Sequence, residues 1–265
     1  MSIISRPIGI FDSGIGGLTV LKEIRKVLPY EDIIYFGDTA RVPYGGKSPQ
    51  TVVRFSTENI LFLLEKKAKL VVVACNTSSS LALEYLKSIF TVPILGVIDS
   101  AVRKAIKVSR EKKIGVIGTK STIRSKAYQK KIYAIDKEAK VYAKPCPLFV
   151  PLVEEGLLEG PIVDKIVQMY LKDLKNKIDT LILGCTHYPL LKKAISRYLK
   201  RVYLVNSAYE VAREAKNILT ENDLLTRKKA SCSVKFYVSD EPLEFMKIAK
   251  IFLKKDIRKP EVVYV

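Results

Sequence analysis

The chain has 265 residues, 48% of them hydrophobic, so it can bury a substantial core or divide into two domains of ordinary size. No apolar run approaches the roughly 20 residues of a membrane-spanning helix, and the first residues lack the pattern of a secretory signal, so we expect a cytoplasmic protein. The formal net charge is +19, but lysine and arginine are scattered through the predicted helices. This distribution favours a solvated basic surface over a nucleic-acid-binding or regulatory one.

The four cysteines lie far apart, without CxxC spacing, and the chain has a single histidine, His187. This composition argues against a structural zinc site. An even number of cysteines permits two disulfides, but a cytoplasmic chain of this size needs none. Cys146 and Cys232 lie in no recognisable motif, and we expect both to be structural.

The first predicted unit is a strand at residues 8–11, a glycine-rich turn that starts at Asp12, and an amphipathic helix over residues 18–28. The turn does not match GxGxxG, because Thr19 stands where the third glycine is needed, so dinucleotide binding is disfavoured. Main-chain N–H groups in such a turn still suit a carboxylate or a phosphate. Asp12 can cap the helix, serve a site, or do both.

The second unit is a strand at residues 33–36, followed by a loop over residues 38–47 and a helix. The loop, DTARVPYGGK, is rich in turn-forming residues and carries Tyr44 and Gly45. Ser48 and Pro49 are typical of a helix start, and the apolar periodicity continues to about residue 64.

The third unit, residues 70–80, reads LVVVACNTSSS and predicts a buried strand that meets a helix. Cys75 would lie at the carboxyl end of this strand, where open α/β sheets form their ligand crevices. We expect the helix N-terminus beside it to favour the thiolate. A strand at 94–98 and a helix at 101–109 follow.

The pattern then begins again, which indicates a duplicated half. IGVIGT at residues 114–119 matches IGIFDS at 8–13, and two further short strings and the cysteine units recur in the same order at spacings of 106 to 110 residues. The second cysteine unit, TLILGCTHYPLL, contains Cys185, Thr186 and His187, and Pro189 fits the first turn of the next helix.

The remaining elements complete the second half and a tail. We expect strands at 114–117, 139–143, 201–205, 234–238 and 262–264, helices at 125–135, after Pro161, near 211–219 and at 242–253, and a loop at 145–156 that carries Glu154. The predicted fold is α/β, with two pseudo-symmetric domains of mainly parallel sheets and an active site in the cleft between them. Residues 1–100 with 208–265 would form the first lobe, and residues 101–207 the second.

Two equivalent lobes, each with a cysteine at a strand end, predict a cleft with one thiol on either side. Such a pair can invert a stereocentre that bears an acidic C–H, because one group removes the proton and the other returns one to the opposite face. Helix N-termini at Asn76 and Thr186 would bind the substrate carboxylate. Asp12 and His187 would adjust the two thiols. Glu154 would orient His187 or hold the substrate ammonium, although Glu155 cannot be distinguished from it by sequence.

Five motifs together resemble the glutamate racemase family: DSGIGGLT, DTARVPYGGKS, ACNTSS, FVPLVEEG and GCTHYPLL. The resemblance runs through nearly all of the first 210 residues. It implies a cofactor-independent two-base racemase with two α/β domains that makes D-glutamate for peptidoglycan, with Cys75 deprotonating D-glutamate and Cys185 deprotonating L-glutamate. The site residues that the resemblance implies are Asp12, Ser13, Tyr44, Gly45, Cys75, Asn76, Thr77, Cys185, Thr186 and His187.

The expected partners are a small-molecule substrate and a second copy of the chain, with no membrane and no nucleic acid required. One alternative is a racemase for aspartate or another amino acid, with the same thiol pair but a different pocket. A second alternative is a thiol nucleophile that uses Cys185 and His187 for acyl transfer, which leaves Cys75 unexplained.

Overall fold

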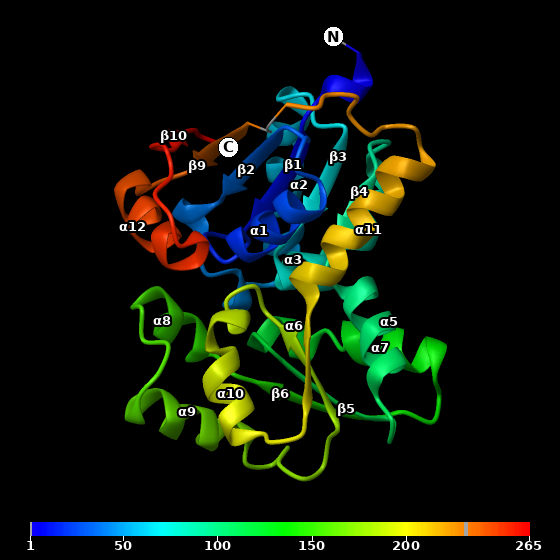
Figure 1. Ribbon diagram of the computed structural model, residues 1–265, viewed down its shortest axis with the longest axis vertical. Helices are drawn as coiled ribbons and strands as arrows, with labels where there is room; N and C mark the ends of the chain where they lie inside the picture. Colours follow the sequence, from blue (N-terminus) through cyan, green and yellow to red (C-terminus); the bar gives the residue numbers. More distant parts are fainter. Residues whose placement is uncertain (1, 231–232) are drawn as a thin grey trace.

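The computed structural model describes residues 2–230 and 233–265, so Cys232 lies outside the described residues. It contains two α/β lobes, each with a parallel sheet covered by helices (Figure 1). The strand order is β10-β9-β2-β1-β3-β4 in the first sheet and β6-β5-β7-β8 in the second. All the strand pairs in both sheets are parallel, which confirms the predicted fold class.

The first lobe is built around the strands β1 to β4, whose apolar residues are buried, as expected where helices cover both faces of a sheet; β9 and β10, at its edge, are more exposed. Its strands are β1 (Ile8–Asp12), β2 (Ile33–Gly37), β3 (Leu70–Val73), β4 (Ile94–Gly96), β9 (Val234–Val238) and β10 (Glu261–Val262). Its α-helices are α1 (Leu18–Val27), α2 (Pro49–Glu65), α3 (Asn76–Leu81), α4 (Leu83–Ile89), α11 (Ser207–Glu221) and α12 (Pro242–Leu253). The 3₁₀ turns are η1 (Ile3–Ser5), η2 (Thr39–Arg41) and η3 (Tyr44–Gly46).

The second lobe is formed by the middle of the chain. Its strands are β5 (Lys113–Gly118), β6 (Lys140–Pro145), β7 (Thr180–Gly184) and β8 (Tyr203–Asn206). Its helices are α5 (Ile98–Val108), α6 (Lys120–Arg124), α7 (Ala127–Ile135), α8 (Phe149–Glu154), α9 (Pro161–Leu171) and α10 (Lys192–Tyr198), with the 3₁₀ turn η4 (Tyr188–Leu191) before α10.

The two lobes share one topology. The order β2-β1-β3-β4 in the first sheet corresponds strand for strand to β6-β5-β7-β8 in the second. This agreement supports the duplication read from the sequence. It makes the carboxyl ends of β3 and β7 equivalent, and these are the strand ends that Cys75 and Cys185 follow.

The chain passes between the lobes twice, through α5 and α11, which lie side by side at one edge of the molecule (Figure 1). An ion pair of 2.8 Å between Arg103 and Glu214 joins these two helices. After α11 the chain returns to the first lobe, where β9 pairs with β2 and β10 extends the sheet. The exact residue boundaries of the two lobes remain a prediction.

Several predicted elements differ from the structure. The expected loop over residues 145–156 contains the helix α8. Pro151 is tolerated there because it lies in the first turn, where N–H groups have no intrahelical acceptor. The strand β4 ends at Gly96 rather than Ile98, so Asp99 lies within α5. Pro189 lies in the 3₁₀ turn η4 rather than in an α-helix.

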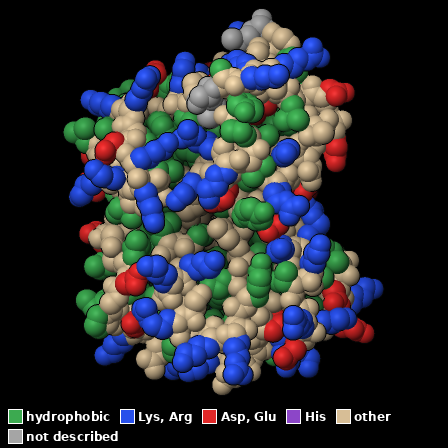
Figure 2. Space-filling model, in the orientation of Figure 1, with side chains coloured by type: hydrophobic (Ala, Val, Ile, Leu, Met, Phe, Trp, Pro, Cys, Tyr) green, Lys and Arg blue, Asp and Glu red, His purple; other side chains and the backbone are tan. Residues whose placement is uncertain are grey.

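The surface is basic but not segregated. Lysine and arginine side chains are distributed over both lobes on the face shown in Figure 2, with acidic and apolar groups between them. Among the residues that the structure describes, no helix has the length and apolar character needed to cross a bilayer.

Candidate active site

A cavity of about 350 Å³ lies between the lobes, and residues of both lobes line it. Ten of the eleven residues predicted for the site contribute to its wall, and the exception is Asp12. From the first lobe these are Ser13, Tyr44, Gly45, Cys75, Asn76 and Thr77, and from the second Glu154, Cys185, Thr186 and His187. The parallel sheets explain this convergence, because the turns after β1, β3 and β7 all leave carboxyl ends of strands.

Cys75 is buried at the N-terminus of α3, and its thiol donates a hydrogen bond to Ser13 Oγ at 3.6 Å. Burial and the nearby Asp12 carboxylate raise the pKa of Cys75 to about 11. The N–H of Ser78 in the first turn of α3 lowers the pKa of Cys75, as expected of a helix N-terminus, but the net shift is upward. Desolvation and a like charge outweigh the short helix, which has only six residues.

Cys185 has a different neighbour, the imidazole of His187, whose Nδ1 lies 3.8 Å from the sulfur. On the other side of the ring, Nε2 donates to Glu154 Oε1 at 3.0 Å. Burial disfavours the charged ring, but the hydrogen bonds with Cys185 and Glu154 outweigh it and raise the pKa of His187 to about 10. The adjacent Glu155 is exposed and does not line the cavity.

Asp12 is fully buried, does not line the cavity and connects the two lobes. Its carboxylate accepts a hydrogen bond from Gly14 N at 3.1 Å and a longer one from Thr186 Oγ1 at 3.4 Å. Burial raises the pKa of Asp12, against the opposing effect of His187. Hydrogen bonds from the backbone N–H groups of Gly14 and Gly17, the N-cap residue of α1, act in the opposite direction and lower this pKa, so Asp12 serves both the helix start and the site.

Asn76 lines the cavity and has a buried side-chain donor without a hydrogen-bond partner. Its Oδ1 accepts from Tyr128 Oη of the second lobe at 2.6 Å, which fixes the orientation of the amide. Its Nδ2 is buried without a protein partner. Because a buried amide group without a hydrogen bond is costly, this nitrogen is suited to bind a substrate oxygen.

The turn after β1 packs directly on the turn after β7. The hydroxyl of Thr19 donates to the carbonyl of Thr186 at 3.0 Å. At Gly16, an added Cβ would overlap Thr186 Oγ1 and His187 Nδ1. Glycine is therefore required at this position for the two turns to approach each other.

Further residues that line the cavity were missed by the sequence reasoning: Val42, Pro43, Gly46, Thr119, Lys120, Pro147, Val150 and Pro151. The internal repeat contained a signal for one of them. Thr119 follows Ser13 by 106 residues, the offset of the matching strands. No comparable pattern marks the prolines, because Pro43 and Pro147 reach the cavity from two separate loops and Pro151 from α8.

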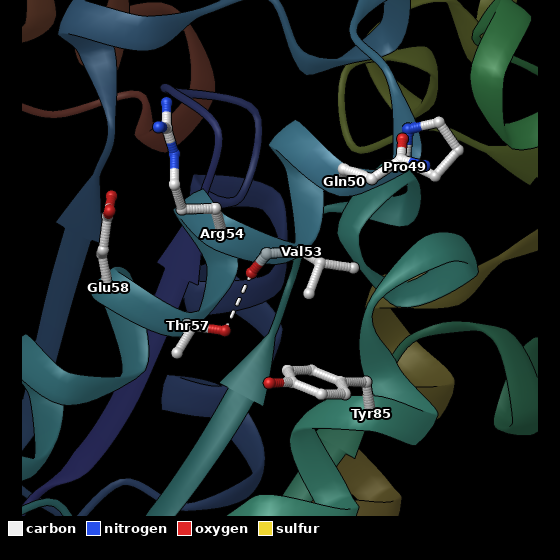
Figure 3. A pocket seen from close by; sticks show the side chains of 7 residues that line it. All are labelled: Pro49, Gln50, Val53, Arg54, Thr57, Glu58 and Tyr85. Atoms are coloured by element: carbon white, nitrogen blue, oxygen red, sulfur yellow. Dashed lines mark hydrogen bonds between the residues drawn. The ribbon is translucent and has the colours of Figure 1, made fainter.

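A second hollow, of about 580 Å³, lies on the outer face of the first lobe between α2 and α4 (Figure 3). It is larger than the cavity between the lobes, but its lining contains no thiol, and its ionisable groups are Arg54, Glu58 and Tyr85. We therefore assign the active site by chemistry rather than by size.

The three cysteines in the described part of the chain are all free thiols. Cys146 is fully buried, does not line the cavity and packs in the core with Phe149 and Tyr188. In residues 2–230 and 233–265, no cluster of three or more histidine, cysteine, aspartate and glutamate side chains is arranged to hold a metal ion.

Comparisons with known proteins agree with one another. The sequence model of the Asp/Glu/Hydantoin racemase family matches residues 15–215. A glutamate racemase of Aquifex aeolicus is 49% identical over 250 residues, which cover 94% of this chain and 95% of that protein. The crystal structure of glutamate racemase from Francisella tularensis in complex with D-glutamate has a TM-score of 0.92 at 40% identity, with 98% of each chain covered. The structure from Aquifex pyrophilus has a TM-score of 0.81 at 49% identity, with 96% of this chain and 97% of that chain covered.

Proposed function

Since the chain belongs to the Asp/Glu/Hydantoin racemase family, we propose that it is a glutamate racemase, an isomerase that interconverts L-glutamate and D-glutamate. The observation that carries the proposal is the pair of free thiols, Cys75 and Cys185, on the wall of one cavity. They follow equivalent strands of two lobes with one topology, so a substrate between them is approached from two sides.

In the proposed mechanism one sulfur, as thiolate, removes the α-proton, and the opposite thiol donates a proton to the other face of the carbon. Following the family pattern, Cys75 acts as base on D-glutamate and Cys185 acts as base on L-glutamate. Each turnover leaves the two cysteines with exchanged protonation states, ready for the reverse reaction. This scheme requires no cofactor, because the two thiols supply both the base and the acid.

The surrounding groups would stabilise the charge that develops during proton removal. The free Nδ2 donor of Asn76, together with Thr77 and Thr186, is suited to bind substrate carboxylates. A protonated His187, held by Glu154, can donate to the sulfur of Cys185 and offset its negative charge. Ser13 would do the same for Cys75 once that thiol has lost its proton.

The wider setting follows from the same family. We propose that the enzyme works in the cytoplasm as a homodimer and supplies D-glutamate for peptidoglycan. We also retain the division into a first lobe of residues 1–100 with 208–265 and a second lobe of residues 101–207. Cell fractionation tests the location, and sedimentation tests the homodimer. Growth without added D-glutamate after gene disruption tests the role in peptidoglycan.

Purified protein, freed of cofactors by gel filtration, should convert L-glutamate into an equal mixture of enantiomers, as measured by chiral chromatography. L-Aspartate and other amino acids are assayed in parallel. Conversion of aspartate with no conversion of glutamate would reject the proposed substrate and favour the alternative racemase. Acyl transfer with no inversion of any amino acid would reject the racemase altogether.

A further inference from the structure

Behind one wall of the cavity lies a buried polar network that the proposed function does not use. Tyr44 belongs to the cavity lining, and its hydroxyl donates to Asp38 Oδ2. Asp38 is fully buried, although it is an acidic residue in a loop that connects β2 to α2. A carboxylate in this position is costly unless several donors satisfy it.

Three side chains satisfy Asp38. The guanidinium of Arg41 binds both carboxylate oxygens through Nε, at 2.8 and 2.9 Å. Ser239, just after β9, donates from Oγ to Oδ1 at 3.0 Å. Tyr44 completes the set, so each oxygen of the carboxylate has two donors.

The network closes on itself through α2. Arg41 donates from Nη2 to Asn59 Oδ1 at 2.9 Å, and Asn59 returns a hydrogen bond from Nδ2 to Tyr44 Oη at 3.1 Å. Arg41 also pairs with Glu58, which faces the outer hollow in Figure 3, and stacks over Phe55 at 4.2 Å. The tyrosine hydroxyl is therefore held from two directions and has little freedom to rotate.

The other side of the same wall is held by the second lobe. Ser121 donates from Oγ to the carbonyl of Gly45 at 2.9 Å. A Cβ added at Gly45 would lie 2.7 Å from Cβ of Thr119, so the loop backbone rests directly on that side chain. Residues 44–45 are thus fixed between the two lobes.

We propose that Asp38 is a positioning residue for substrate binding, which acts through the Tyr44 hydroxyl to hold the wall formed by Tyr44 and Gly45 at its distance from the two cysteines. The inference rests on the proposed function for its substrate, glutamate. It also gives the end of β9 a part in the site through Ser239, although the motifs that identify the family lie within the first 210 residues. Burial and the neighbouring Asp38 raise the pKa of Tyr44 well above its ordinary value, so the phenol stays a neutral donor.

The first test is Asp38→Asn, which keeps the size of the side chain but removes its charge and one acceptor. Hydrogen bonds to a charged group of this kind correspond to about 10- to 100-fold in an equilibrium constant. We expect KM for both enantiomers to rise by about tenfold or more, while kcat changes much less, because the cysteines are untouched. A loss confined to kcat, or no change in either constant, would overturn the inference.

A double-mutant cycle with Tyr44→Phe distinguishes positioning through Tyr44 from a general loss of structure. Phenylalanine removes the hydroxyl through which Asp38 acts. In that background Asp38→Asn should raise KM by no more than about threefold. If the two effects on KM multiply independently, Asp38 does not act through Tyr44 and the proposal fails.

Two milder variants guard against misfolding. Ser239→Ala removes one donor to Asp38 and leaves the ion pair with Arg41 intact, and it should raise KM severalfold. Thr39→Val is the matched control, because Thr39 bonds only to the backbone of Asp240, at 2.5 and 2.9 Å, in the same contact between loop and tail. Equal effects of these two substitutions would contradict a specific role for Asp38.

Calorimetric titration with D-glutamate separates this inference from the proposed function, because binding does not require turnover. If wild-type protein binds D-glutamate but does not racemise it, the proposed reaction fails, and the inference is judged by the dissociation constants alone. These should rise at least tenfold in Asp38→Asn. An unchanged dissociation constant in that variant, or no binding to wild-type protein, would overturn the inference.

Discussion

The two cysteines of the cavity have different surroundings, although the strands that carry them are equivalent. Cys75 contacts a serine hydroxyl and lies near the buried carboxylate of Asp12, whereas Cys185 lies beside an imidazole that Glu154 holds. The substrates are mirror images of equal free energy, so the ratio of kcat/KM values in the two directions must be one in every variant. The asymmetry can therefore appear only in individual steps and in the reactivity of each thiol.

Replacement of either cysteine should remove racemisation, because the reaction needs a proton donor or acceptor on both faces. We expect Cys75→Ala and Cys185→Ala each to lower kcat/KM by at least about 10²- to 10⁴-fold, the usual contribution of one acid or base. Chiral chromatography measures the loss. Cys146→Ala is the matched control, since this buried thiol does not line the cavity, and it should retain activity.

The raised pKa of Cys75, about 11, predicts that its thiol reacts slowly with alkylating reagents at neutral pH. Since only the thiolate is alkylated, the rate with iodoacetamide should increase with pH toward about 11 and be small at pH 7. Mass spectrometry of the Cys185→Ala variant measures the alkylation rate of Cys75. The alkylation rate of Cys185, measured in the Cys75→Ala variant, serves as the comparison. Rapid alkylation of Cys75 at pH 7 with a titration near the ordinary thiol value would contradict the assigned environment.

The sequence indicates which residues near the strand ends belong to the site, but it does not indicate their pKa values. Cys75, Cys185 and His187 could be selected because small polar residues follow buried strands there. The pKa of Cys75 moved against the sequence expectation because desolvation and Asp12 come from distant parts of the fold. The choice between Glu154 and Glu155 likewise depends on which side of α8 faces His187.

At the scale of elements, the important contact is between two turns, the one that precedes α1 and the one that precedes η4. Gly16 allows them to touch, and Thr19 fixes the contact by its hydrogen bond to Thr186. The position of His187 therefore depends on a glycine of the other lobe.

Gly16→Ala should displace Thr186 and His187 and lower kcat/KM at least tenfold, because displacements of about 1 Å at a catalytic group are costly. Gly14→Ala is the matched control in the same turn, where an added Cβ would meet only Val42, at 3.4 Å. The kcat/KM values for racemisation by both variants are compared after their melting temperatures have been shown to be equal. Equal activity of the two variants would show that the contact between the turns does not position His187.

The secondary structure was predictable where periodicity and capping agreed. The α2 helix begins after Ser48, whose Oγ accepts from Thr51 N, as the Ser-Pro signal indicates. The α8 helix was missed because Pro151, and Pro145 and Pro147 before the helix, read as loop residues, although Phe149, Leu152 and Val153 have helical spacing and are buried. Short helices of this kind depend on tertiary burial rather than on local signals.

At the scale of the whole molecule, a buried ion pair on the first lobe ties the N-terminal residues to the segment that follows α11. Lys69 Nζ lies 2.6 Å from Glu31 Oε2 and donates to the carbonyls of Ile4 and Leu224 at 2.7 and 2.8 Å. The second oxygen of Glu31 accepts from Thr226 N at 2.7 Å. One pair thus joins the first residues, the sheet and the segment that follows α11.

Lys69→Met should lower the free energy of unfolding by about 3–5 kcal/mol, because it leaves the buried carboxylate of Glu31 without its ion-pair partner. For a chain of this size the melting temperature should fall by roughly 10 °C. The control is Lys26→Met, in an exposed pair with Glu23, which should cost less than about 1 kcal/mol. Calorimetry measures both, and a similar small effect of the two substitutions would contradict this role of Lys69.

The duplication was visible in the sequence because the glycine anchors, short strands and cysteine units recur in order. The sheets have the corresponding strand orders. What the sequence did not reveal are the contacts between the halves, such as Tyr128 with Asn76 and Ser121 with Gly45. These depend on how two folded surfaces meet, for which a single sequence contains no periodic signal.

The two crossings of the chain, through α5 and α11, have a mechanical consequence. Because both covalent connections lie at one edge, a rigid rotation of one lobe about that edge moves its near helices little and its remote loops most. The sulfurs of Cys75 and Cys185 belong to different lobes, so such a rotation moves one sulfur relative to the other. A small angular change at the edge therefore becomes a change in the gap across which a proton must travel.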